Sequence, residues 1–280
     1  MEGRNVRVMS FNVRGASHRD GINAWEKRAR LNVETIKRYA PDVLGLQEVH
    51  APNLEVYKEE LPGYARVMGP AYGTDRLEEF AAIFYDAERF EELDAGGFWL
   101  SDTPEESSAS WGNEVVRSAN WAVLEDRRSG VAFLHANTHL DHASKRARLE
   151  GNKLIVRQTE ETLENHGHPP TVVTGDFNCR PDSAPYRVFR EYGFADTFRA
   201  VGNEDDEGAY TFHAFKGSGF TPRDTDKPFG RIDWILLKDP GDLFEVRSHQ
   251  IVRDADEEAG RYPSDHYPVM ADLGVAEKEV

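Results

Sequence analysis

The stretch Thr171-Val172-Val173-Thr174-Gly175-Asp176-Phe177-Asn178 joins a short buried strand to a polar loop. Asp176 and Asn178 lie two residues apart, so an extended segment places both side chains on one side. A carboxylate here can align or deprotonate water, and a carboxamide can hydrogen-bond a phosphate oxygen or the nucleophile. An Asx turn after a strand is the other common use of these residues.

Polar groups of the same kind close five other apolar runs of the chain. They are Ser10-Phe11-Asn12, Gln47-Glu48, Asn137-Thr138-His139, Arg231-Ile232-Asp233-Trp234-Ile235 and Ser264-Asp265-His266. Loops and strand ends are where a rigid scaffold places its chemistry. Gathered at one edge of a sheet, these groups would form a site for a hard cation with a His/Asp pair beside it.

Strand-like and helix-like segments alternate along the chain, which predicts an α/β fold. Apolar residues at helical spacing predict helices over 25–39, which Pro41 ends, and over 146–164. The expected strands cover residues 6–12, 42–47, 81–85, 121–124, 131–138, 171–174, 232–237 and 267–273. No repeat or linker divides the sequence, so we expect one domain over residues 1–280 with a core from about 6 to 273.

The charge balance is strongly acidic. The 280 residues contain 50 acidic and 34 basic side chains, a formal net charge of −16, with 25 arginines and nine lysines. Such a surface suggests adaptation to high salt, although an ordinary acidic mesophilic enzyme is the alternative. It also repels a long polyanion, which favours a small phosphoester or a short nucleic acid. A local basic patch such as Lys145, Arg146 and Arg148 would weaken that argument, but a solvated helix face explains these residues as well.

The cysteine content and the lack of a long apolar segment bear on where the protein is found. The single cysteine, Cys179, cannot form an intramolecular disulfide, and we interpret it as a packing residue rather than a nucleophile. Residues 1–7 are polar, and no apolar window has the length of a transmembrane helix. We therefore expect a cytoplasmic monomer without a membrane partner.

Glu48 follows a largely apolar strand, so its carboxylate emerges where the strand ends. A buried carboxylate is costly unless a cation or an arginine offsets its charge. Asn12 and Asp265, in similar positions, favour the cation. Oxygen ligands without a cysteine cluster select Mg²⁺ or Mn²⁺ over Zn²⁺.

Asp233 and His266 form a second expected pair. An imidazole held by a carboxylate keeps its proton near neutral pH and can stabilise a phosphorane-like transition state. Asp265 faces the opposite way from His266 in an extended chain and so can reach a metal. His139 is a candidate donor to a phosphate oxygen, and Asp141, on the same side, could fix its tautomer.

Taken in order, these motifs resemble those of the endonuclease/exonuclease/phosphatase superfamily. The resemblance implies the deoxyribonuclease I-like fold, a four-layer α/β/β/α sandwich of two mixed sheets flanked by helices. It implies that Asn12, Glu48 and Asp265 hold the metal and that Asp176, with Asn178 beside it, aligns or activates water. The Asp233–His266 pair and His139 are then expected to contact the scissile phosphate.

Further motifs resemble those of particular branches of this superfamily. Trp25-x-x-Arg28, Thr211-Phe212-His213 and the run from Gly260 to His266 resemble the nocturnin and deadenylase side and prokaryotic hydrolases of the family. Arg117, Arg28, His213 and Asp141 are candidate substrate-binding residues, with surface arginines paired to surplus carboxylates as the alternative. The prediction is a Mg²⁺- or Mn²⁺-dependent phosphatase or phosphodiesterase. An endo- or exonuclease on DNA or RNA, and a catalytically silent binding protein, are the rivals.

Overall fold

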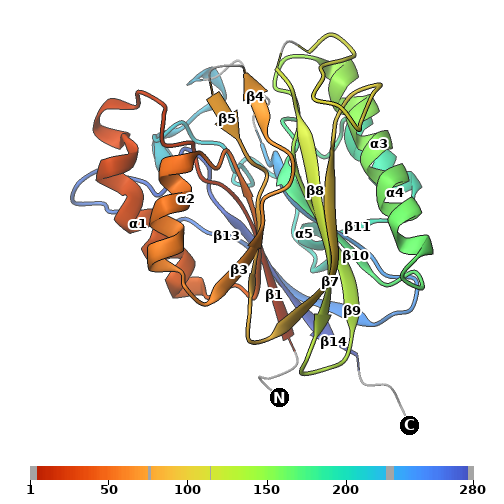
Figure 1. Cartoon of the computed structure of the whole chain (residues 1–280). Helices are drawn as coiled ribbons and strands as arrows, with labels where there is room; N and C mark the ends of the chain where they lie inside the picture. Colours follow the sequence, from red (N-terminus) through yellow and green to blue (C-terminus); the bar gives the residue numbers. More distant parts are fainter. Residues whose placement is uncertain (1–4, 75–76, 114, 225–229, 277–280) are drawn as a thin grey trace.

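Two six-stranded mixed sheets pack face to face, and helices cover the outer face of each sheet (Figure 1). The computed structural model describes residues 5–74, 77–113, 115–224 and 230–276. Helices α1 and α2 cover one sheet, and α3 and α4 cover the other. This arrangement confirms the four-layer α/β/β/α sandwich. No helix among the described residues combines the length and hydrophobicity needed to span a membrane.

The first sheet carries the N-terminal strand at its centre. Its order is β13 (Phe244–Ile251), β14 (Val269–Val275), β1 (Asn5–Asn12), β2 (Val43–Gln47), β6 (Ile83–Asp86) and β3 (Tyr64–Val67). Helix α1 (Trp25–Tyr39) makes the crossover between β1 and β2, which pair in parallel. Helix α2 (Ala51–Glu60) follows β2 on the same outer face. Because β1 and β2 are parallel, their carboxyl ends lie at one edge.

The second sheet repeats this arrangement. Its order is β11 (Ala195–Asp196), β12 (Asp233–Lys238), β10 (Thr171–Asp176), β9 (Ala132–His139), β8 (Ser118–Asp126) and β7 (Phe90–Trp99). Helix α3 (Lys145–Glu164) connects the parallel strands β9 and β10. The remaining elements are α4 (Ala184–Glu191), α5 (Thr197–Ala200), the ribbon of β4 (Tyr72–Thr74) and β5 (Leu77–Glu79), and the 3₁₀ turns η2 (Gly21–Asn23), η3 (Gly217–Gly219) and η4 (Pro222–Asp224).

Three apolar clusters fill the spaces between the four layers. Met9, Ile36 and Tyr57 belong to the cluster between the first sheet and its helices. Two further clusters lie between the sheets, where Phe133 and Val172 pack, and between the second sheet and α3 and α4. A strand buried on both faces reads as a continuous apolar run, which is why 42–47 and 171–174 were recognisable in the sequence.

The predicted elements match the structure closely, but several elements were missed. The helix predicted over 25–39 has those bounds, and the helix predicted from 146 begins one residue earlier. All eight predicted strands are present with shifted ends. The helices α2 and α4 and the long strands β7 and β13 were not predicted.

A polar layer joins the two sheets just beneath the edge where the strands end. Gln47 of β2 donates from Nε2 to Asn137 Oδ1 of β9 at 2.7 Å, and Asn137 Nδ2 donates to the carbonyls of Leu46 and Ala82. Gly45 allows this close approach, since a Cβ there would lie 2.0 Å from Thr174 Oγ1. Asn137 therefore has a packing role.

We expect Gly45→Ala to lower the free energy of unfolding by about 1–3 kcal/mol, because the added methyl group forces the sheets apart. Gly63→Ala is the matched control, since a Cβ at Gly63 meets no atom within 4 Å. It should change stability by less than about 0.5 kcal/mol. Urea unfolding of both variants measures the difference, and equal stability would contradict close packing at Gly45.

Candidate active site

Strand register brings the polar strand ends to one edge of the sandwich. In the second sheet Asp176 lies opposite His139 of the parallel strand β9 and opposite Asp233 of the antiparallel strand β12. In the first sheet Asn12 lies opposite Gln47, so Glu48 follows directly beside it. The two sets face each other across the space between the sheets.

The carboxylate of Asp176 lies at the centre of the group and has no exposed surface. Its Oδ2 accepts a hydrogen bond from Asn12 Nδ2 at 3.0 Å and lies 3.3 Å from His139 Nε2. His266 Nε2 is 3.7 Å from the same oxygen. The second oxygen, Oδ1, accepts the backbone N–H of Asn178 at 3.0 Å. One buried anion is thus shared by side chains from both sheets.

His266 and Asp233 form the expected ion pair, with Nδ1 and Oδ2 3.0 Å apart. Burial alone would lower the pKa of His266, but the charges of Asp233 and Asp176 outweigh it and raise the pKa to about 9. His266 is therefore a cation at neutral pH. Thr211 Oγ1 accepts the backbone N–H groups of Ile232 and Asp233 and so fixes the start of β12.

Glu48 lies on the other side of Asn12. Its Oε1 accepts from Asn12 Nδ2 at 2.9 Å, and its Oε2 lies 3.2 Å from His18 Nε2. Burial alone would raise the pKa of Glu48, but His18, His139 and Arg14 hold it well below its usual range. The carboxylate is therefore ionised.

Asp265 completes the acidic side of the site through Arg14. Arg14 Nε lies 3.8 Å from Asp265 Oδ2, and the same guanidinium forms two hydrogen bonds to the carboxylate of Asp20. Burial would lower the pKa of Arg14, but Asp20, Asp265 and Glu48 raise it. The charges of Glu48 and Asp265 thus both act on the guanidinium of Arg14.

The donor set fits a hard divalent cation. Asn12, which bonds Asp176, offers a carboxamide oxygen, and Glu48 and Asp265 offer carboxylate oxygens. The hydroxyl of Ser264, next to Asp265, donates to the carbonyl of Asn12 at 2.6 Å, and the one cysteine of the chain is not in this set. Mg²⁺ and Mn²⁺ prefer such oxygens.

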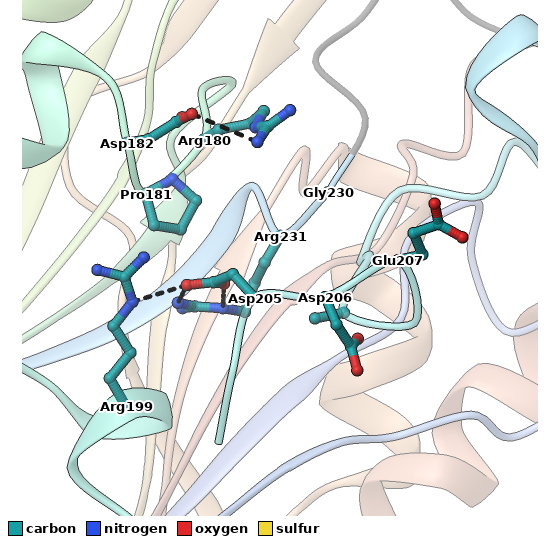
Figure 2. A pocket seen from close by; sticks show the side chains of 10 residues that line it. Arg180, Pro181, Asp182, Arg199, Asp205, Asp206, Glu207, Gly230 and Arg231 are labelled. Carbon is teal, nitrogen blue, oxygen red and sulfur yellow. Dashed lines mark hydrogen bonds and ion pairs between the residues drawn. The ribbon is translucent and has the colours of Figure 1, made fainter. Parts of the chain in front are cut away.

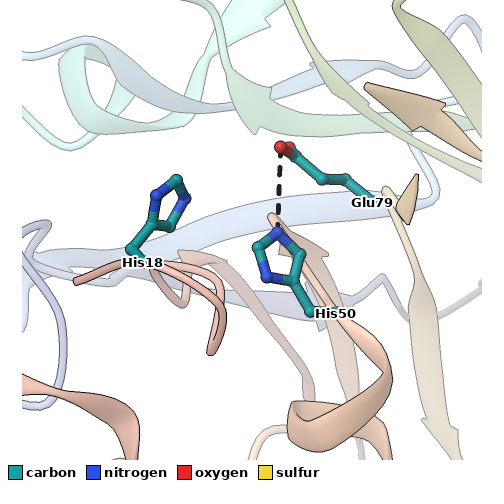
Figure 3. A group of neighbouring side chains, drawn as sticks. All are labelled: His18, His50 and Glu79. Carbon is teal, nitrogen blue, oxygen red and sulfur yellow. Dashed lines mark ion pairs between the residues drawn. The ribbon is translucent and has the colours of Figure 1, made fainter. Parts of the chain in front are cut away.

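Two groups of three side chains among the described residues have the spacing of metal ligands. The first group consists of the His266–Asp233 ion pair and the neighbouring Asp176. A protonated His266 has no free lone pair with which to bind a metal. The second is His18, His50 and Glu79, shown in Figure 3.

A hydrogen bond to His50 argues against a metal in the second group. His50 Nδ1 accepts the backbone N–H of Ser17 at 3.1 Å, so the neutral ring carries its proton on Nε2. That N–H faces Glu79 Oε1 at 3.7 Å. A metal at Nε2 would need the lone pair that the proton occupies.

Asn178 and Cys179 follow Asp176 directly. The carboxamide of Asn178 donates to the carbonyl of Leu140 at 3.0 Å, and its buried Oδ1 has no hydrogen-bond partner among the described residues. Burial raises the pKa of the Cys179 thiol to about 12. This result confirms Cys179 as a packing residue, while Asn178 keeps an acceptor for a bound molecule.

Two predicted substrate-binding residues have structural roles. Arg28 is fully buried, and its guanidinium donates to the carbonyls of Val13, Asn23 and Pro263 as well as that of Arg14. His213 is also fully buried, stacks on Tyr267 at 4.0 Å, and has its pKa lowered by burial to about 3. These contacts give both side chains a packing role, and substrate binding by either one stays a prediction.

The role expected for Asp141 requires correction. Its Oδ1 accepts the backbone N–H groups of Ala143 and Ser144, just before α3 begins. His139 instead places Nδ1 3.2 Å from Tyr72 Oη, and its Nε2 faces Asp176. Tyr72 and Asp176 therefore orient the His139 ring, whereas Asp141 shapes the loop.

An ion-pair network lies beside the site and holds Arg231, two residues before Asp233. Arg231 binds the carboxylate of Asp196. It also binds Asp205, which Arg199 contacts as well (Figure 2). These residues border a hollow of about 380 Å³. Because the cations around Asp205 are paired within the network, we interpret it as support for β12.

Comparison with known proteins agrees with this geometry. The model of the Endonuclease/Exonuclease/phosphatase family matches residues 9–266. The chain belongs to this family of hydrolases that act on phosphoester bonds. The family resemblance inferred from the sequence is thereby confirmed.

Sequence relatives cover part of the chain. Protein angel of Drosophila melanogaster is 28% identical over 165 residues, which cover 58% of this chain and 46% of that protein. Human nocturnin is 26% identical over 206 residues, covering 66% of this chain and 45% of nocturnin. The matched region therefore spans slightly under half the length of these two relatives.

Solved structures match over nearly the whole length. A mannosyl-6-phosphatase from Bacteroides thetaiotaomicron superposes with a TM-score of 0.83 at 31% identity, covering 96% of this chain and 99% of that one. The human nocturnin catalytic domain superposes with a TM-score of 0.76 at 21% identity, covering 98% and 94%. The second likeness shows the shared fold alone.

The raised pKa of His266 gives a prediction with a defined sign. The imidazole of His266 should titrate near pH 9, and Asp233→Asn should lower that midpoint because the nearest anion is lost. The charge of His266 should stabilise the fold fully below about pH 6.5, the ordinary histidine value, and this contribution should disappear as pH rises to about 9.

Nuclear magnetic resonance of labelled histidines measures the midpoint, and urea unfolding across the same pH range measures the stability. The fully buried His135, whose pKa burial lowers to about 3, should remain neutral throughout and serves as the internal control. A His266 midpoint near the ordinary value in the wild type would contradict the ion pair.

Proposed function

We propose that this chain is a Mg²⁺- or Mn²⁺-dependent phosphoester hydrolase in which water attacks the phosphorus in line. The observation that carries the proposal is the position of Asp176. Its carboxylate lies between the oxygen donors Asn12 and Glu48 on one side and the imidazoles of His139 and His266 on the other. An anion so placed can hold water beside a phosphoryl group whose charge the imidazoles balance.

Each side chain then has a separate task. Asp176 aligns the attacking water and accepts its proton, while Oδ1 of Asn178, which has no partner among the described residues, accepts a second hydrogen bond from that water. The oxygen of water bonds to phosphorus as the bond to the leaving oxygen breaks. Protonated His266 donates to a phosphoryl oxygen, an N–H of His139 donates to another, and both stabilise the charge that develops there.

Asn12, Glu48 and Asp265 would hold the divalent ion. When bound, the ion would neutralise charge on the phosphoryl group and the leaving oxygen. Asn12 Nδ2 also bonds both Glu48 and Asp176, so it holds the two carboxylates at a fixed distance.

A small phosphoester is the substrate class that we favour. The net charge of −16 opposes binding of a long polyanion, and the described site is lined mainly by buried carboxylates and imidazoles. The name of the mannosyl-6-phosphatase, 31% identical over nearly the whole chain, points the same way. The silent binding protein is the weakest rival, because every carboxylate and imidazole that the chemistry needs is present.

A nuclease is the second candidate, because the sequence also matches 3′-5′-exoribonuclease subunits. A panel of sugar and nucleotide phosphates, assayed beside single-stranded and duplex nucleic acid with Mg²⁺ or Mn²⁺, separates the two. The panel should be run at low and molar salt, which also tests the expected adaptation to high salt. Turnover of small esters and none of nucleic acid is the expected result. Preferred cleavage of nucleic acid would overturn the substrate class.

Two substitutions test the roles of Asp176 and His266. Asp176→Asn and His266→Gln should each lower kcat at least about a hundredfold, the usual size of general-base and electrostatic contributions. Asp94→Asn is the matched control, because Asp94 lies on the edge strand β7, is exposed, and pairs with His166. Either active-site variant retaining near-normal kcat would contradict its role.

A further inference from the structure

One buried arginine lacks the partners that the other buried arginines have. The described residues include five buried arginines, Arg28, Arg89, Arg117, Arg148 and Arg231. Arg89 and Arg231 bind carboxylates, while Arg28 and Arg148 donate to backbone carbonyls. Neither Arg117 nor Arg148 forms an ion pair with a described residue, and the Nε of each is buried without a hydrogen-bond partner among them. Arg148 still donates to a carbonyl at 2.8 Å, whereas the one polar side-chain contact of Arg117 among the described residues is an imidazole nitrogen at 3.4 Å.

Arg117 lies next to the catalytic edge of the second sheet. It precedes β8, whose Ala119 pairs with Thr138 of β9, so it lies beside the end of the strand that carries His139. The side chain is only 6% exposed. Its Nη2 faces His142 Nδ1 at 3.4 Å, and its Cζ lies 5.6 Å from the centre of the Tyr72 ring.

Tyr72 contacts both Arg117 and residues of the site. Tyr72 Oη accepts the backbone N–H of Glu48 at 2.9 Å and lies 3.2 Å from His139 Nδ1. The Tyr72 ring also meets the His139 ring edge to face, with centres 5.8 Å apart. Both Arg117 and His139 therefore lie against one aromatic ring.

Burying a cation without a counter-charge costs free energy. The contacts with Tyr72 and His142 offset part of that cost, but neither supplies a negative charge. A phosphate oxygen would, because a guanidinium binds phosphate with several N–H groups at once. A cation kept unpaired at this point is the expected arrangement where the missing anion arrives with the substrate.

The number of charges distinguishes the ester classes. A phosphomonoester carries two negative charges and three terminal oxygens near neutral pH, whereas a diester carries one charge and two such oxygens. His139, His266 and the cation site suffice for two oxygens. An additional buried cation is useful only for the third.

We propose that Arg117 binds the third terminal oxygen of a phosphomonoester dianion and so selects monoesters of small alcohols over diesters. This inference rests on the proposed function, since it needs the phosphoryl group beside His139. It assigns Arg117 to substrate recognition and leaves the attack of water to Asp176.

Paired substrates with a common leaving group test the inference. Arg117→Met should lower kcat/KM for p-nitrophenyl phosphate at least about thirtyfold and for methyl p-nitrophenyl phosphate less than about threefold, since only the dianion uses the extra charge. Arg117→Lys, which keeps the charge, should recover part of the monoester activity. Arg146→Met, an exposed arginine on the nearby start of α3, is the matched control and should change neither rate.

Two readouts separate recognition from a structural role. Binding of inorganic phosphate, measured by calorimetry with Mn²⁺, should weaken about tenfold or more in Arg117→Met. The melting temperature should stay equal to or rise above that of the wild type, because the lost cation had no counter-charge. A lower melting temperature together with unchanged phosphate binding would overturn the inference.

The outcomes also separate this inference from the proposed function. Equal losses for both esters, or no loss for either, would overturn monoester selection while leaving the hydrolase intact. Wild-type protein that hydrolyses neither ester would count against the proposed function, and phosphate binding would then decide the role of Arg117 alone.

Discussion

The buried carboxylate of Asp176 is the group on which the site depends. It accepts from Asn12 of the first sheet and lies within 3.7 Å of two imidazoles, His139 of the second sheet and His266 from the loop before β14. An anion without exposed surface is stable only when such partners surround it. Any change in how the sheets pack therefore changes the geometry of this carboxylate, and the close approach at Gly45 belongs to the function as much as to the fold.

Local backbone strain marks the same places. Glu48 and Asn178 have φ values of +58° and +48°, each just beyond a buried strand. A left-handed conformation is unfavourable for a glutamate, so tertiary contacts must maintain it. The bond from the Glu48 N–H to Tyr72 Oη and that from the Asn178 N–H to Asp176 Oδ1 do so. The turns that these residues make aim their side chains into the space between the sheets.

Sequence patterns predicted the polar residues at the strand ends but not the residues that contact them. Glu48 and Asp176 were found because each closes a nearly continuous apolar run. The packing role of Arg28 was not predicted because nothing local shows that its partner carbonyls include Pro263, 235 residues away. His18 and Tyr72 were missed because they lie in a turn and a short ribbon that lack a periodic pattern. Helix α2 was missed because it buries few residues and lacks a strong apolar face, and β13 because it is an edge strand with mixed polarity.

Crystals grown with Mn²⁺ would test the central claim most directly, because anomalous scattering locates the ion independently of any assay. The arrangement of Asn12, Glu48 and Asp265 predicts one ion that contacts Glu48, directly or through water, beside Asp176. Glu48→Gln should weaken or abolish that signal. An ion bound instead at His50 and Glu79, or a signal unchanged in Glu48→Gln, would contradict the account.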